Sequence, residues 1–223
     1  MKKYHEVPYE LKNQIYQTVK DFGCVRWKAL LIYAGALTRR CRFLPEEVRN
    51  DQSERIAYNA LNALLSKEDG RLSRAEYGDE QVIIPAGSTK MSFDALYAFE
   101  AFSALVEEVS DKDLLPEMCY ASECSVYPYQ YIFTSGKEDN LYRVLVYGAD
   151  SFSRIGFLEN TYKKDKRYIT MLVVPDVYSW EEFTDVTIPG SYRIALVTKG
   201  NRKNRTYKCQ MTEIMEDSDE SKL

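Results

Sequence analysis

The chain has 223 residues, enough for one large domain or two small ones with a buried core. Hydrophobic residues make up 45% and charged residues 29%, with both signs mixed, which excludes a wholly disordered chain. The formal net charge of −4 excludes a histone-like polycation. The first 90 residues hold 15 Lys and Arg against 12 Asp and Glu, whereas residues 91–223 hold 15 against 22. This asymmetry predicts two domains with different partners.

The sequence carries no sign of export or membrane insertion. The basic start of the chain is followed by Pro8 and Glu10 rather than by an apolar run, so we expect no signal peptide. No stretch approaches the roughly 20 apolar residues that cross a bilayer. The five cysteines are scattered and odd in number, which is typical of reduced thiols. We therefore expect a cytoplasmic protein without a membrane partner.

Hydrophobic periodicity predicts three helices in the first part of the chain. The first spans about 8–22, where apolar residues recur every fourth position. The second spans about 26–34 and is expected to end at Gly35. The third is expected to begin at Asp51, whose carboxylate can cap it, with Glu54 three residues later in a capping-box-like pair.

A β-hairpin is predicted directly after these helices. Residues 72–77 and 81–85 have strand-like composition and flank a Gly78–Asp79 turn. Three helices followed by a hairpin are the order of a winged helix-turn-helix domain, which we expect over 1–87.

The rest of the chain is predicted to form a small α/β domain over 88–212, followed by an acidic, disordered tail over 213–223. The near-continuous apolar run at 167–174 indicates a central strand. The expected fold class is therefore α+β. The expected elements are helices at 92–109, 152–160 and around Trp180, and strands at 126–134, 141–147, 167–174, 192–198 and 205–211.

Residues for common catalytic chemistry are missing from the sequence. The one histidine, His5, lies near the amino terminus, which argues against an imidazole base or a His metal ligand. Cys119 and Cys124 lack the spacing of a zinc site. Neither a phosphate-binding glycine loop nor a nucleophile elbow is present. We therefore expect no catalytic residue, no metal and no cofactor.

A metal-dependent nuclease often places an acid and a lysine two residues apart on a strand. Only two pairs have this spacing, Glu10 with Lys12 and Glu220 with Lys222. They lie in the first helix and in the tail, so the sequence predicts that the protein is not an enzyme. A divergent nuclease-like enzyme with a rearranged site stays open as an alternative.

Three alternating tyrosines share one face of a predicted strand. Tyr127, Tyr129 and Tyr131 could stack on bases or pack beneath a neighbouring helix. Packing is the favoured interpretation, because Val126 and Ile132 point the other way and both strand faces look covered.

Basic and amide side chains gather on the predicted winged helix. Residues 22–44 hold five basic residues and no acid. Arg and Asn on the third helix offer bidentate contacts to base edges, and arginines on the loops and wing suit phosphates. Acids at the start of the third helix oppose this interpretation, and a plain solvated helix face is the alternative. The predicted DNA-binding residues are Arg26, Lys28, Arg39, Arg40, Arg42, Arg55, Asn59, Asn62, Arg71 and Arg74.

Five segments carry a resemblance to a known family: 22–31, 58–65, 82–87, 127–133 and 166–174. In them the chain resembles the replication-relaxation and mobilisation-accessory family of winged-helix proteins, carried by plasmids and integrative elements. The second half resembles the family's restriction-endonuclease-like α/β fold that lacks catalytic residues. The chain departs from the family in an expected long insert at 38–50.

The resemblance implies a non-enzymatic DNA-binding accessory or regulatory protein of a mobile element, acting in replication, mobilisation or transcription control. Double-stranded DNA is the expected partner, with a protein partner or a homodimer as further possibilities. An alternative is an interaction module whose winged helix binds protein and no nucleic acid.

Overall fold

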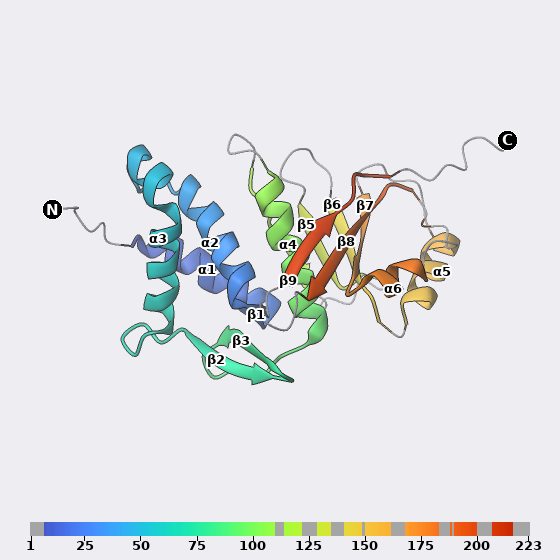
Figure 1. Ribbon diagram of the computed structural model, residues 1–223, viewed down its shortest axis with the longest axis horizontal. Coiled ribbons are helices and arrows are strands. Elements are labelled where there is room, and N and C mark those ends of the chain that lie inside the picture. The colour runs from blue at the N-terminus through green and yellow to red at the C-terminus, as the bar shows by residue number, and fades with distance from the viewer. Residues whose placement is uncertain are drawn as a thin grey trace. The chain divides into compact units, whose positions relative to one another are not determined.

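The structure is a computed structural model that describes residues 7–109, 114–121, 129–134, 141–148, 150–161, 168–182, 188, 190–199 and 207–215. Six helices and two β-sheets lie in these ranges, which confirms the α+β class (Figure 1). The chain divides into two compact units, residues 1–96 and 97–223. The division lies beyond the boundary expected between residues 87 and 88, and it falls inside a helix.

The first unit contains three helices and a three-stranded antiparallel sheet. Its elements are α1 (Tyr9–Phe22), β1 (Val25–Arg26), α2 (Trp27–Arg40), α3 (Glu46–Leu65), β2 (Leu72–Tyr77) and β3 (Glu80–Pro85). The sheet order is β1-β3-β2. The predicted hairpin is confirmed, since Leu72 pairs with Pro85 and Tyr77 with Glu80 around a turn at Gly78. Strand β1 was not predicted.

Strand β3 and the start of the next helix close the first unit. Cys24, Val82, Ile84 and Leu96 form one buried cluster. The Ser92 hydroxyl accepts a hydrogen bond from the Ala95 N–H and caps this helix, α4 (Phe93–Glu108). The beginning of α4 therefore belongs to the first unit.

Helix α2 is longer than the sequence predicts. The expected end at Gly35 is wrong, because the helix continues through buried Ala36 and Leu37 to Arg40. Burial of these side chains outweighs the roughly 1 kcal/mol that glycine costs inside a helix. Thr38 fits the helix because its hydroxyl donates to the Ala34 carbonyl at 2.7 Å.

Helix α3 begins earlier than predicted. Its N-cap is Pro45, so the expected start at Asp51 and the capping pair with Glu54 are wrong. Glu46 and Glu47 occupy the first turn, where acidic side chains interact favourably with the helix dipole. The expected insert at 38–50 is therefore mainly helical, and only residues 41–45 connect α2 with α3.

The second unit contains one six-stranded mixed sheet. Its strands are β4 (Met118–Ala121), β5 (Tyr131–Thr134), β6 (Leu141–Val146), β7 (Tyr168–Val174), β8 (Tyr192–Lys199) and β9 (Tyr207–Met211), in that order. Strands β6, β7 and β8 are parallel, and the outer pairs are antiparallel. Strand β7 is internal and mostly buried, which confirms the predicted central strand. Strand β4 was not predicted.

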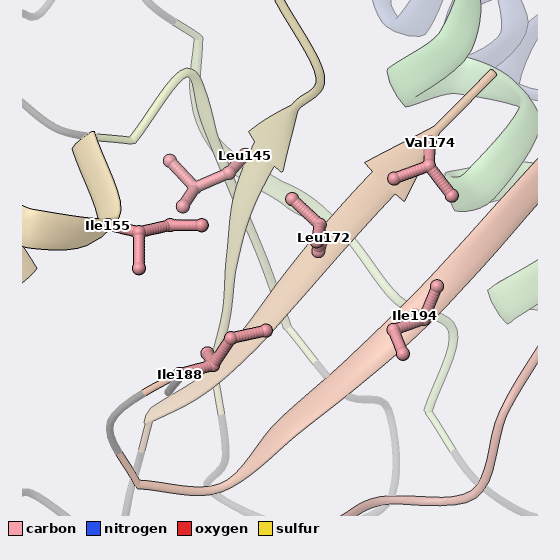
Figure 2. Packing of buried hydrophobic residues seen from close by; sticks show 6 residues of the cluster. All are labelled: Leu145, Ile155, Leu172, Val174, Ile188 and Ile194. Atoms are coloured by element: carbon pink, nitrogen blue, oxygen red, sulfur yellow. The ribbon is translucent and has the colours of Figure 1, made fainter. Parts of the chain in front are cut away.

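Helices cover both faces of this sheet. Phe102 of α4 packs on Phe133 with ring centroids 4.9 Å apart. Ile155, from α5 (Ser151–Thr161), packs with Leu145 and Leu172 on the opposite face, together with Ile188 (Figure 2). The short helix α6 (Val177–Glu181) follows β7.

The two described tyrosines serve packing, but the expectation that they share one face of a strand is wrong. Tyr131 is buried in β5 and pairs with Val144, whereas Tyr129 precedes the strand and packs against the cluster around Leu145 on the other side of the sheet (Figure 2). Tyr127 lies outside the described residues, as does His5. Of the expected tail at 213–223, residues 213–215 are described, and Met215 bridges to Tyr192.

Candidate nucleic-acid interface

Three elements of the first unit meet at Trp27, the first residue of α2. The Trp27 ring meets the Tyr58 ring of α3 edge to face, with centroids 6.0 Å apart and planes at 87°. The Arg74 guanidinium of β2 lies 5.3 Å from the centre of the same Trp27 ring. These three residues, which we call the Trp27 cluster, hold the start of α2, the middle of α3 and the hairpin in one surface.

A stripe of exposed polar residues follows α3 through this surface. Arg55, Tyr58, Asn59 and Asn62 have the spacing of one helix face, and all four are exposed. We call them the α3 stripe. The structure therefore brings three of the predicted DNA-binding residues together with Tyr58, which the sequence did not single out.

Arg74 has a defined orientation although its side chain is exposed. Its Nη1 donates to Gln81 Oε1 at 3.0 Å across the hairpin, while its guanidinium faces Trp27. Lys28, in the first turn of α2, is also exposed. Arg74, a member of the cluster, and Lys28, next to Trp27 in the sequence, are therefore both accessible to solvent.

Arg26 serves the interior rather than the surface. It is only 6% exposed, and its Nε donates to Glu80 Oε2 at 2.7 Å. A buried guanidinium needs such a partner, because removing a charge from water is costly. We therefore leave Arg26 out of the surface that we propose below.

Arg71 joins the hairpin to α1. Its Nε donates to Asp69 Oδ1 at 2.6 Å, and its guanidinium lies 5.3 Å from the Tyr16 ring and 5.7 Å from the Tyr9 ring. Lys12 lies 3.5 Å from the same carboxylate. The hydrogen bond from Arg71 is the main cause of a lowered pKa of Asp69. Arg71 is therefore engaged in an internal network.

The remaining predicted cations lie at the far end of α2. Arg39 and Arg40 occupy its last turn and are partly buried, and Arg42 is exposed just beyond. At 1.5 Å per residue, this end lies roughly 20 Å along the helix from Trp27. The acidic first turn of α3 follows within a few residues, so both signs of charge are mixed there.

The two aromatic residues of the cluster were missed for different reasons. Trp27 is partly exposed in the structure, although a large apolar residue in a predicted helix is most readily assigned to the core. Tyr58 is three residues from Arg55 and adjacent to Asn59, so its place on the stripe was readable from helical spacing.

Acidic side chains and cysteines elsewhere in the described residues do not gather into a metal site. Among them, no three His, Cys, Asp or Glu side chains are grouped so as to hold a metal ion. Asp150 pairs with Arg154 at 2.6 Å, which is ordinary for a helix surface. The other acids near predicted strand ends, Glu123, Glu138 and Asp139, lie outside the described residues.

The described cysteines Cys24, Cys41, Cys119 and Cys209 are free thiols, as expected. None of the helices within the described ranges has the length and apolar character needed to cross a bilayer.

No protein-family model and no curated protein sequence matches the chain. The Trp27 cluster and the α3 stripe are therefore the features of the chain that bear on its function.

Proposed function

We propose that residues 8–86 form a winged helix that binds double-stranded DNA, and that the protein acts as a non-enzymatic accessory or regulatory factor. The observation that carries the proposal is the Trp27 cluster. It holds the α3 stripe and the hairpin in one surface that presents cations, amides and an aromatic ring. A helix flanked by a hairpin is the arrangement that winged helices use to enter the major groove and meet the backbone beside it.

The charge distribution along α3 supports its carboxyl-terminal half as the DNA-facing part. Residues 46–54 hold four acids, whereas residues 55–66 hold one arginine and no acid. The acids of residues 46–54 repel phosphates, whereas residues 55–66 carry no negative charge that would repel them. Residues 55–66 also carry Tyr58, next to Trp27.

Within this surface, we assign two kinds of contact. Lys28 and Arg74 contact phosphates and position the protein without reading sequence. Arg55, Asn59 and Asn62 face base edges, where guanidinium and amide groups make bidentate hydrogen bonds. Arg39, Arg40 and Arg42 form a second, separate candidate for phosphate contacts at the other end of α2.

The cellular setting is also part of the proposal. The resemblance to the replication-relaxation and mobilisation-accessory family supports a role for this protein on a mobile element in the cytoplasm. In this proposal the second unit is a restriction-endonuclease-like domain without catalytic function.

A second candidate function is protein binding by the first unit. The acids Glu46, Glu47, Asp51 and Glu54, all exposed on the first part of α3, favour it, since they suit a basic protein partner better than DNA.

An electrophoretic shift with random-sequence duplex at two salt concentrations separates the two candidates. DNA binding is expected to weaken steeply with salt, because each phosphate contact releases counterions. Absence of salt-sensitive binding at micromolar protein would favour the protein-binding candidate.

A further inference from the structure

Tyr58 is an exposed aromatic side chain in the middle of a polar stripe. Half of it is exposed, at 50% of its full surface. A single exposed tyrosine needs no explanation on its own. This one lies between Arg55 and Asn59 on the face that we assign to base contacts, and it has a defined neighbour.

The neighbour fixes how the Tyr58 ring is presented. Trp27 meets it edge to face, an arrangement favoured by the opposite charge on ring faces and edges. Trp27 is itself covered by Arg74, whose guanidinium is oriented by Gln81. The ring is thus held from one side and open to solvent on the other, so little conformational entropy is lost when a ligand covers it.

The chemistry of Tyr58 and of the neighbouring Asn59 indicates which base Tyr58 would contact. In the major groove, an A·T pair presents the N6 and N7 groups of adenine, which suit an Asn amide, and the C5-methyl group of thymine, which suits an apolar contact. Tyr58 and Asn59 are adjacent on α3, so they reach the same or neighbouring base pairs.

On this basis we propose that Tyr58 is a specificity-determining residue that covers a thymine methyl group, so that the preferred DNA site contains an A·T pair beneath the middle of α3. The inference rests on the proposed function and deepens it. It assigns to Tyr58 a direct contact with a base and to Trp27 the role of positioning the Tyr58 ring.

The test begins with a preferred site selected from a random duplex library by the full-length protein. Each thymine of that site is then replaced by deoxyuridine, which removes only the C5-methyl group. At one position, the affinity of the wild-type protein is expected to fall roughly three- to fivefold, the equivalent of losing one buried methyl group. Tyr58→Ala should bind the thymine duplex with a similar loss and show no further loss with deoxyuridine.

Tyr58→Phe is the matched control, because it keeps the ring and removes only the hydroxyl. It is expected to retain the thymine preference. Two results would overturn the inference: wild-type binding unaffected by deoxyuridine at every position, or a Tyr58→Ala variant that still distinguishes the two bases. Both results require a protein that binds a preferred duplex. Failure of the proposed function would look different, because no salt-sensitive binding to any duplex would be seen. In that case the inference about Tyr58 would fail as well.

Discussion

Arginines of the first unit have different roles that their sequence neighbours do not reveal. Arg26 is buried against Glu80, Arg71 lies on two tyrosine rings beside Asp69, and Arg74 is exposed over Trp27. In the sequence, all three look like equally good phosphate ligands. The three arginines differ in burial and in the position of the nearest carboxylate. Arg26 and Glu80, for example, are more than 50 residues apart in the sequence and meet only because their strands pair.

The Arg26–Glu80 pair gives a prediction for stability. Glu80→Ala should lower the free energy of unfolding of the first unit by about 3 kcal/mol, because it leaves a buried guanidinium without this carboxylate. Unfolding in guanidinium chloride, followed by the fluorescence of Trp27 in a Trp180→Phe background, measures the effect. Glu76→Ala, an exposed residue of the same hairpin, should change stability by less than about 0.5 kcal/mol. Equal effects of the two variants would show that the ion pair is not structural.

Asp69 gives a pH-dependent prediction. Its pKa is lowered in the folded protein, mainly by the hydrogen bond from Arg71. Its contribution is therefore present above the unfolded-state pKa of about 4 and is lost as the pH falls through the lower folded-state pKa. The stability gap between wild type and Asp69→Asn should be about 1 kcal/mol at pH 7 and should shrink below about pH 4. In an Arg71→Ala background this gap should be smaller at pH 7; an unchanged gap would contradict the assigned cause.

At the scale of elements, sequence periodicity predicted which helices and strands exist better than it predicted where they begin and end. The hairpin and the central strand were predictable because alternation and a Gly-Asp turn are local signals. The end of α2 was not, since burial of Ala36 and Leu37 against the rest of the unit outweighs Gly35. The start of α3 was misread at Asp51, although Pro45 followed by two acids is also a start signal.

The candidate site was predicted only in part for a related reason. Arg55, Asn59 and Asn62, which were predicted to bind DNA, have the spacing of one helix face, and all three are exposed. The contact of Trp27 with both Tyr58 and Arg74 joins three elements that are distant in sequence, so no local pattern contains it.

Because Arg74 of the hairpin contacts Trp27 of α2, we expect its charge and its planar shape to make separate contributions to duplex binding. Arg74→Lys keeps the charge but loses the planar group over Trp27. We expect it to weaken duplex binding roughly twofold to threefold, with an unchanged salt slope. Arg74→Ala should in addition make the log–log salt slope shallower by about 0.9, one phosphate contact. Titrations at several salt concentrations check this, and identical slopes for wild type and Arg74→Ala would remove Arg74 from the phosphate contacts.

At the scale of the whole molecule, we propose no catalytic role for the second unit. Purified protein is expected to leave supercoiled plasmid intact with Mg²⁺ or Mn²⁺, because in the described part of the chain no strand carries an acid followed two residues later by a lysine. Metal-dependent nicking that is abolished by replacing a carboxylate of the second unit would contradict this and support the nuclease-like alternative.

The central claim, that the first unit binds duplex DNA around Trp27, is tested most directly by the salt slope of a triple variant. Lys28→Ala/Arg55→Ala/Arg74→Ala removes Arg74 of the Trp27 cluster and two further cations of the proposed surface. Lys20→Ala/Lys90→Ala/Lys208→Ala removes the same charge from exposed positions outside the proposed surface.

Binding of one random-sequence duplex is measured for the three proteins over a series of salt concentrations. We expect a log–log slope shallower by about 2 for the first variant, at roughly 0.9 for each of the phosphate contacts of Lys28 and Arg74, and the parent slope for the second. The claim is contradicted if the first variant binds with the parent affinity and slope, or if the parent itself shows no salt-sensitive binding at micromolar concentration.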